Sequence, residues 1–205
     1  MPTHSTPAPR PLFRRTLPLF LATGVLAACS AAPPAEPPLK GASIGGDFTL
    51  MGENNQPVSW SDFQGKYRIV YFGYTYCPDI CPVDVQRSMR GLAQFAREEP
   101  ELAAKVQPIF ISVDPERDDP AVLREFTDAF SPDLIGLTGT PEQIKQTAKD
   151  FGVAYSRGED QPGGGYLVGH SGLTLLFGPD GEPLATLPTD QGADAVAAEL
   201  ARWVS

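Results

Sequence analysis

An almost unbroken apolar and β-prone run, Tyr67–Tyr74, leads directly into a pair of cysteines, Cys77 and Cys81. A run without polar alternation is typical of a strand buried on both faces of a sheet. Pro82 follows at once, and proline is well placed in the first turn of a helix. The segment therefore predicts a central strand, a turn that carries the cysteines, and then a helix.

The segments on either side alternate between strand and helix patterns. Short strands are expected at Phe48–Leu50 and around Val58, and a second buried strand over Val106–Val113. The remaining elements, in chain order, are a helix over Pro120–Phe130, a strand over Leu134–Leu137, a helix over Pro141–Phe151 with Thr140 as its N-cap, a glycine loop at Gly163–Gly165, a hairpin of Gly172–Phe177 and Pro183–Leu187, and a helix over Asp194–Val204. This order predicts an α/β domain, with a thioredoxin-like fold whose central mixed sheet is flanked by helices.

The N-terminal region has the pattern of an export signal. Residues 1–28 contain basic but no acidic side chains, and the apolar run Leu17–Ala28 is shorter than the roughly 20 residues that span a bilayer. Leu26-Ala27-Ala28-Cys29 resembles the bacterial lipobox, in which the cysteine is lipidated. A plain secretory cleavage site beside a cysteine is the alternative.

These patterns divide the chain into three parts. They are a lipoprotein-type signal peptide (1–28), an Ala/Pro-rich tether (29–41) that cannot bury a core, and one folded domain (42–205). We expect a domain fixed to the cell membrane through a lipid on Cys29, facing the periplasm or another extracytoplasmic space. With 25 acidic against 16 basic residues and a net charge of −9, the chain offers no basic patch, so nucleic acid is not an expected partner.

Few chemically reactive side chains remain in the expected mature domain. With Cys29 assigned to the lipid and His4 lost with the signal, they are Cys77, Cys81 and His170. If both cysteines lie in a helix, their spacing of four puts them on one face, where they could share a metal ion or form a disulfide. The helix N-terminus would also favour their thiolates. A purely structural disulfide is the alternative, although so short a loop would stabilise the fold little.

The donor types favour copper. Two thiolates and one imidazole suit Cu(I), and also a Cu(II) site completed by oxygen or water. Zinc accepts the same donors, but a structural zinc site usually has four protein ligands. A single histidine such as His170 is otherwise an ordinary surface or core residue.

Four blocks resemble the Sco/SenC family, in the order that the family has them. They are Phe72–Pro82 (FGYTYCPDICP), Phe110–Asp118 (FISVDPERD), Gly136–Thr140 (GLTGT) and Tyr166–Ser171 (YLVGHS). The resemblance extends over about residues 46–204. It implies a thioredoxin-like fold and a copper-binding protein that helps to assemble the dinuclear copper centre of cytochrome c oxidase, with Cys77, Cys81 and His170 as copper ligands.

The resemblance also implies partners, and the chain departs from the family pattern at one position. The partners would be the copper-bearing subunit of the oxidase and an upstream copper donor or thiol reductant. The family often has Asp before the histidine, whereas this chain has Gly169. Asp79 and Asp114 could orient the ligands, or could serve as a helix cap and a turn residue.

Several functions remain open at this point. A metallochaperone, which is not a catalyst, is the first hypothesis, with copper as Cu(I), Cu(II) or both. The second is a thiol–disulfide oxidoreductase that reduces the oxidase's cysteines, although the spacing is C-x-x-x-C and not C-x-x-C. A peroxiredoxin-like peroxidase is a third hypothesis. Such enzymes usually have a proline and threonine pattern ahead of the reactive cysteine, and this chain does not match it: Thr75 lies two residues before Cys77, and no proline precedes it. A copper or redox sensor would use the same residues.

Overall fold

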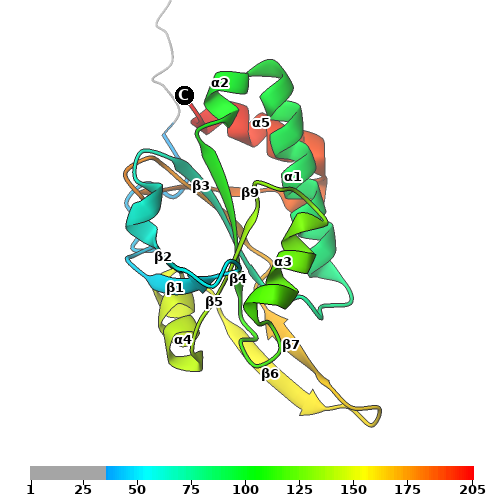
Figure 1. Cartoon of the computed structure of the whole chain (residues 1–205). Helices are drawn as coiled ribbons and strands as arrows, with labels where there is room; N and C mark the ends of the chain where they lie inside the picture. Colours follow the sequence, from blue (N-terminus) through cyan, green and yellow to red (C-terminus); the bar gives the residue numbers. More distant parts are fainter. Residues whose placement is uncertain (1–35) are drawn as a thin grey trace, which may run out of the picture. The chain divides into compact units, whose positions relative to one another are not determined.

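A computed structural model of the chain describes residues 36–205, which contain a seven-stranded mixed sheet with helices on both of its faces (Figure 1). The strand order is β2-β1-β5-β4-β3-β8-β9, and a separate two-stranded sheet joins β6 to β7. The strands are β1 Thr49–Gly52, β2 Pro57–Ser59, β3 Tyr67–Gly73, β4 Val106–Ser112, β5 Ile135–Thr138, β6 Tyr155–Asp160, β7 Tyr166–His170, β8 Thr174–Phe177 and β9 Pro183–Leu187. The helices are α1 Ile80–Glu98, α2 Pro100–Ala103, α3 Pro120–Asp128, α4 Pro141–Asp150 and α5 Ala193–Trp203, with short 3-10 turns η1 Trp60–Phe63 and η2 Thr189–Gln191.

Strand β3 lies in the middle of the sheet and is buried along its whole length. It pairs in parallel with β4 and antiparallel with β8. A strand covered on both faces has no solvent side on which to place polar residues, which explains its almost wholly apolar sequence, in which Arg68 is the one charged residue. The end of β3 therefore delivers the cysteine turn to the middle of the domain.

Successive residues of β3 point to opposite faces and enter two different cores. Ile69 packs with α1 and α5 through Phe95, Val196 and Leu200. On the other face, Val70 and Phe72 belong to a core that also contains an aromatic cluster. In that cluster Trp60 lies edge-on to both Phe151 and Phe177, with each pair of ring centroids 5.3 Å apart. The two cores fix β3 and α1, the elements that precede and follow the cysteine turn.

Most of the predicted elements are confirmed, with boundaries shifted by one to three residues. The central mixed sheet, the hairpin of β8 and β9, and the closing helix are present. Thr140 caps α4 as predicted, and Gln143 completes a capping box with it. Helix α1 begins at Ile80, two residues before Pro82.

Strands β6 and β7 were not predicted, and neither were the short helix α2 and the turns η1 and η2. Residues Tyr155–Asp160 and Tyr166–His170 form the β6–β7 hairpin, and the expected glycine loop Gly163–Gly165 lies at its tip. Almost all of β6 is exposed, so its sequence shows no alternation of apolar and polar residues. Without that alternation, period-based reasoning has no strand signal to detect.

Several expectations concern residues outside the described part of the chain. The signal peptide, the lipidation site Cys29 and the first part of the tether all lie there. The chain already contacts the domain at Leu39, whose N–H donates to the Leu184 carbonyl at 2.9 Å. Among residues 36–205, no helix has the length and apolarity needed to cross a bilayer.

Candidate metal centre

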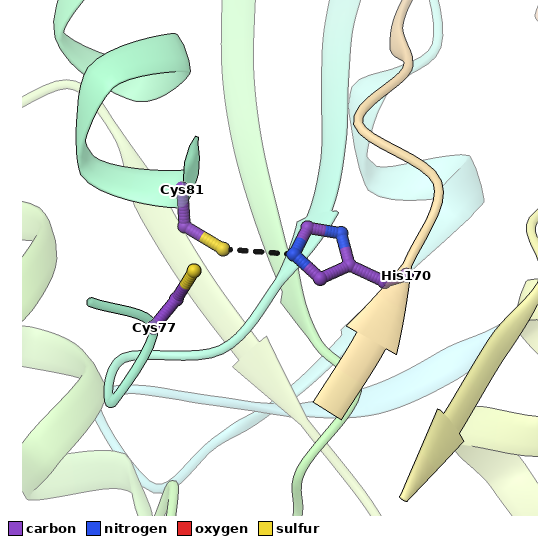
Figure 2. Close-up of side chains that lie close together, drawn as sticks. All are labelled: Cys77, Cys81 and His170. Atoms are coloured by element: carbon purple, nitrogen blue, oxygen red, sulfur yellow. Dashed lines mark hydrogen bonds between the residues drawn. The ribbon is translucent and has the colours of Figure 1, made fainter. Parts of the chain in front are cut away.

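Three potential metal ligands come together from three parts of the fold (Figure 2). Cys77 lies in the turn between β3 and α1, Cys81 in the first turn of α1, and His170 at the end of β7. The Cys81 Sγ and His170 Nε2 atoms are 3.0 Å apart, and all three donor atoms lie within 4.8 Å of one another. Donors bound to one ion at about 2.0–2.3 Å lie at most roughly 4.6 Å apart, so small side-chain adjustments would let all three bind a single ion.

The condition that both cysteines lie in one helix is not met. Helix α1 begins after Asp79, so Cys77 precedes the helix and only Cys81 belongs to it. A turn in which the Cys77 N–H donates to the Tyr74 carbonyl at 3.2 Å places the Cys77 side chain beside the helix start. Both cysteines are free thiols. The sulfurs therefore converge through a turn, not through helical periodicity.

The two thiols differ in burial and in acidity. Burial alone would raise the pKa of the half-buried Cys77, but hydrogen bonds from the backbone of Cys81 and Asp79 hold it below its ordinary value. Burial raises the pKa of Cys81, which is completely buried. Cys77 is thus the more readily ionised sulfur, and a metal that binds both must displace the proton of Cys81.

His170 is oriented for binding through Nε2. Its ring stands edge-on to Tyr71 and Tyr74, with ring centroids 6.0 and 5.9 Å away. Nδ1 lies 3.3 Å from the Ser171 carbonyl, so a proton on Nδ1 leaves the Nε2 lone pair facing Cys81. Burial lowers the pKa of His170, which favours the neutral imidazole that binds metals.

A backbone carbonyl of this chain, and not a side chain at position 169, faces Nδ1 of His170. Gly169 pairs with Ser156 in the exposed β6–β7 hairpin and supplies no side chain. The Ser171 carbonyl is an acceptor for Nδ1, the ring nitrogen remote from the sulfurs. A second partner of this kind fixes the orientation and the tautomer of a histidine ligand.

Gly73, the last residue of β3, leaves room for the Cys81 sulfur. A Cβ atom at this position would lie 3.0 Å from Cys81 Sγ and 2.8 Å from Tyr71 Cε1. Real Cβ atoms almost never approach other heavy atoms more closely than 3.0 Å. The absence of a side chain at Gly73 therefore sets the depth at which Cys81 is buried.

Replacing Gly73 by alanine should accordingly weaken Cu(I) binding about 10–100-fold, the range seen when a group that orients a metal ligand is lost. The added methyl group has to displace the Cys81 sulfur or the Tyr71 ring. A competition titration of the reduced protein measures the change. Gly139→Ala is the matched control, because its Cβ would be crowded to 3.0 Å by Gln143 and Leu50, which are not part of the centre. Equal losses in both variants would contradict this local explanation.

A buried carboxylate fixes the turn that carries Cys77. Asp118 is fully buried and accepts three hydrogen bonds, from the Thr75 N–H (3.0 Å), the Thr75 hydroxyl (2.6 Å) and the Ser112 hydroxyl (2.6 Å). Ser112 ends β4, and Thr75 lies two residues before Cys77. Asp118 therefore ties the cysteine turn to the neighbouring strand.

Arg117 connects the cysteine turn to the histidine hairpin. Its guanidinium lies over the ring of Tyr166 on β7, with Cζ 3.7 Å from the ring centroid, and 5.0 Å from that of Tyr76 beside Cys77. Asp114 holds both sides of this contact, since it accepts from Arg117 Nε at 2.5 Å and from the Tyr166 hydroxyl at 2.6 Å. One cation thus packs between the two segments that supply the ligands.

The sequence-based reading had singled out Asp79 and Asp114 but not these residues. Asp79 occupies the N-cap position of α1, although its side chain makes no capping hydrogen bond. Asp114 holds Arg117 and Tyr166, so its role is to fix the hairpin that carries His170. Arg117 and Asp118 both lie in the block Phe110–Asp118 that carried the resemblance, and this block was the one signal that pointed to them.

The fold and the centre together define a class of protein: a thioredoxin-like domain with two thiols at the start of its first long helix and a histidine brought to them from a distant hairpin. The chain belongs to the SCO1/SenC family, whose model matches residues 36–205. This confirms the resemblance noted in the sequence.

Individual relatives agree with this assignment. Protein SenC of Rhodobacter capsulatus is 47% identical over 139 residues, which are 67% of this chain and 60% of that protein. The mitochondrial SCO2 homolog of Mus musculus is 42% identical over 144 residues, 70% of this chain and 56% of the relative. The chain spans about half the length of the curated relatives it matches.

A solved structure gives the same fold and bears on the metal. The crystal structure of Arabidopsis thaliana ScoI with copper bound is 35% identical, with a TM-score of 0.71 over 77% of this chain and 95% of the other. Two sulfurs and one imidazole within reach of a single ion form a group suited to copper. The centre described here therefore fits the metal found in its structural relative.

Proposed function

We propose that this protein is a copper metallochaperone that delivers copper to the dinuclear copper centre of cytochrome c oxidase during assembly, and that Cys77, Cys81 and His170 hold the copper. The observation that carries the proposal is the convergence of these three donors within 4.8 Å, on a framework like that of a copper-bound relative. The oxidase as recipient is supported by membership of the family and by the role that the resemblance implies.

The geometry suits a carrier that must both hold and release its cargo. Three donors leave room in the coordination sphere for a ligand from another protein, whereas a closed four-ligand site would not. The half-buried Cys77 lies in a turn and Cys81 is fully buried, so an incoming thiolate approaches from the side of Cys77. Copper can then pass by exchange of one ligand at a time.

Thiol–disulfide exchange is the second candidate, and one observation favours it. Cys77 has a lowered pKa and is accessible, while Cys81 is buried with a raised pKa. An accessible thiolate beside a protonated partner is the arrangement of an attacking and a resolving cysteine. This reaction needs no contribution from His170, so the histidine distinguishes the two functions.

A transfer experiment tests the proposal. The reduced protein loaded with Cu(I) is mixed with the reduced, metal-free copper domain of the oxidase subunit, and copper on each protein is measured after separation. We expect transfer from the parent, and little stoichiometric loading or transfer with Cys77→Ser, Cys81→Ser or His170→Ala. The metal-free protein is also mixed with the oxidised recipient. Reduction of that recipient at full rate by His170→Ala, together with no copper transfer by the parent, would instead establish the oxidoreductase.

The location of the protein at the membrane is part of the proposal. The basic and apolar pattern of residues 1–28 and the Leu26-Ala27-Ala28-Cys29 sequence support export and lipidation at Cys29. The Ala/Pro-rich stretch that follows supports a spacer between the membrane and the domain. The domain would then face the extracytoplasmic side of the membrane.

A further inference from the structure

The large apolar side chains exposed on this domain gather around the metal centre. Residues 36–205 expose six of them, and five lie within three positions of a proposed copper ligand. The five are Tyr76 beside Cys77, Ile80 and Val83 beside Cys81, and Leu167 and Leu173 on either side of His170, each 41–54% exposed. The sixth, Met51, lies on β1 toward the opposite edge of the sheet. Exposed apolar side chains that gather in one region of a domain mark an interaction site more often than isolated apolar residues do.

Three of the five side chains line one groove. Ile80, Val83 and Leu173 border a hollow of about 530 Å³ between the start of α1 and the segment from Leu187 to Gln191. Gly172 also lines this hollow beside Ile80, and a Cβ there would be in ordinary contact, at 3.4 Å, with both Ile80 Cδ1 and Asp84 Oδ2. The groove thus begins beside the cysteines and provides a concave apolar surface next to them.

The groove has an acidic rim. Asp79 and Asp190 line it and are exposed. The cation in its lining, Arg87, is half-buried and donates to the Thr189 carbonyl at 3.0 Å. The chain as a whole has a net charge of −9. A partner with basic residues would be attracted here, whereas a second copy of this chain would bring an acidic rim against an acidic rim.

We propose that this apolar surface, defined by Tyr76, Ile80, Val83, Leu167 and Leu173, is the docking face for the protein that receives the copper. We further infer that this recipient presents an apolar segment flanked by lysine or arginine. The inference rests on the proposed function. Direct ligand exchange requires the recipient's donors to reach the ion, so the surface that surrounds the ligands must be the surface that is covered. Apolar contact excludes water from the exchange, and the opposite charges speed the encounter.

Lysine substitutions test the docking face without touching a ligand. In Val83→Lys and Leu173→Lys, singly and together, an apolar contact is lost and a positive charge faces a basic partner. The matched control is Met51→Lys, which makes the same type of change on the exposed apolar residue outside the face. The rate of Cu(I) transfer to the reduced copper domain of the oxidase subunit is measured for each loaded protein, alongside its Cu(I) affinity.

We expect the double variant to transfer copper at least about tenfold more slowly than the parent, as befits the loss of central interface contacts. Its Cu(I) affinity should stay within about twofold of the parent's, Met51→Lys should behave as the parent, and added salt should slow the parent because it screens the acidic rim. Transfer by the double variant at the parent's rate, or equal slowing by Met51→Lys, would overturn the docking face alone. A parent that transfers no copper would overturn the proposed function, and the docking face with it. Dimerisation of the parent that the double variant abolishes would assign the face to a second copy instead.

Discussion

Replacement of His170 by alanine is expected to weaken Cu(I) binding by more than about 100-fold. Loss of a group that only orients a ligand costs 10–100-fold, and His170 is proposed as a ligand itself. Its Nε2 atom lies 3.0 Å from Cys81 Sγ, and its removal leaves two sulfurs to hold the metal. A competition titration against a Cu(I) chelator, with the protein kept reduced and free of oxygen, measures the affinity.

Ser171→Ala provides the control for this variant. Ser171 is adjacent to His170, and its hydroxyl is buried without a hydrogen-bond partner. The backbone carbonyl that faces His170 Nδ1 is retained in the alanine variant. Ser171→Ala should therefore bind Cu(I) as the parent does. Unchanged affinity in His170→Ala would remove the histidine from the metal centre.

Replacement of Asp118 by alanine is expected to lower the free energy of unfolding by about 3 kcal/mol, since it leaves one buried and two partly buried donors without an acceptor. The three donors are the N–H and hydroxyl of Thr75 and the hydroxyl of Ser112. Urea denaturation of the metal-free protein measures the loss. Asp119→Ala serves as a comparison, because Asp119 is exposed and only caps α3, and it should cost about 1 kcal/mol. Equal losses in the two variants would contradict the role assigned to Asp118.

The Asp118→Asn variant tests the charge of this carboxyl separately. Burial raises the pKa of Asp118 in the folded protein, although its hydrogen bonds from Ser112 and Thr75 oppose the shift. At a pH between the pKa of Asp118 in the unfolded chain and its higher pKa in the folded protein, the folded protein binds more protons than the unfolded chain. The contribution of Asp118 to stability is therefore greatest below the unfolded pKa and falls as the pH rises through the folded pKa. Asparagine cannot ionise. The stability of Asp118→Asn relative to the parent should therefore improve as the pH rises from acid to neutral, and a change in the opposite direction would show that the folded pKa is lowered.

The elements that could be predicted are those with a local sequence signal, such as a hydrophobic pattern, a capping residue or a turn residue. Strand β3 is an almost unbroken apolar run because both of its faces are covered. Helix α4 begins where Thr140 and Gln143 form a capping box, and the β8–β9 hairpin turns at residues 178–182. In each case the residues of the element itself, or those next to it, are enough to predict it.

The β6–β7 hairpin could not be predicted in this way, because its stability comes from contacts across the chain. Tyr166 on β7 contacts Asp114 and Arg117, which lie about 50 residues earlier in the chain. The cysteine pair was visible in the sequence and His170 was assigned through the resemblance to the Sco/SenC family, but neither predicted the shape of the metal centre. Helical spacing suggested that Cys77 and Cys81 share a helix face, whereas a turn brings them together.

The metal centre is assembled from residues far apart in the chain, and this links copper to the lifetime of the protein. Cys81 and His170 are separated by 89 positions, so the unfolded chain keeps only its two cysteines close together. A ligand that binds the folded state alone stabilises it by about 4 kcal/mol when its concentration is a thousandfold above its dissociation constant. Loss of the copper then leaves a chain that opens more readily. Since proteolysis follows the population of opened chains, we expect the metal-free protein to be more susceptible to degradation than the copper-bound one.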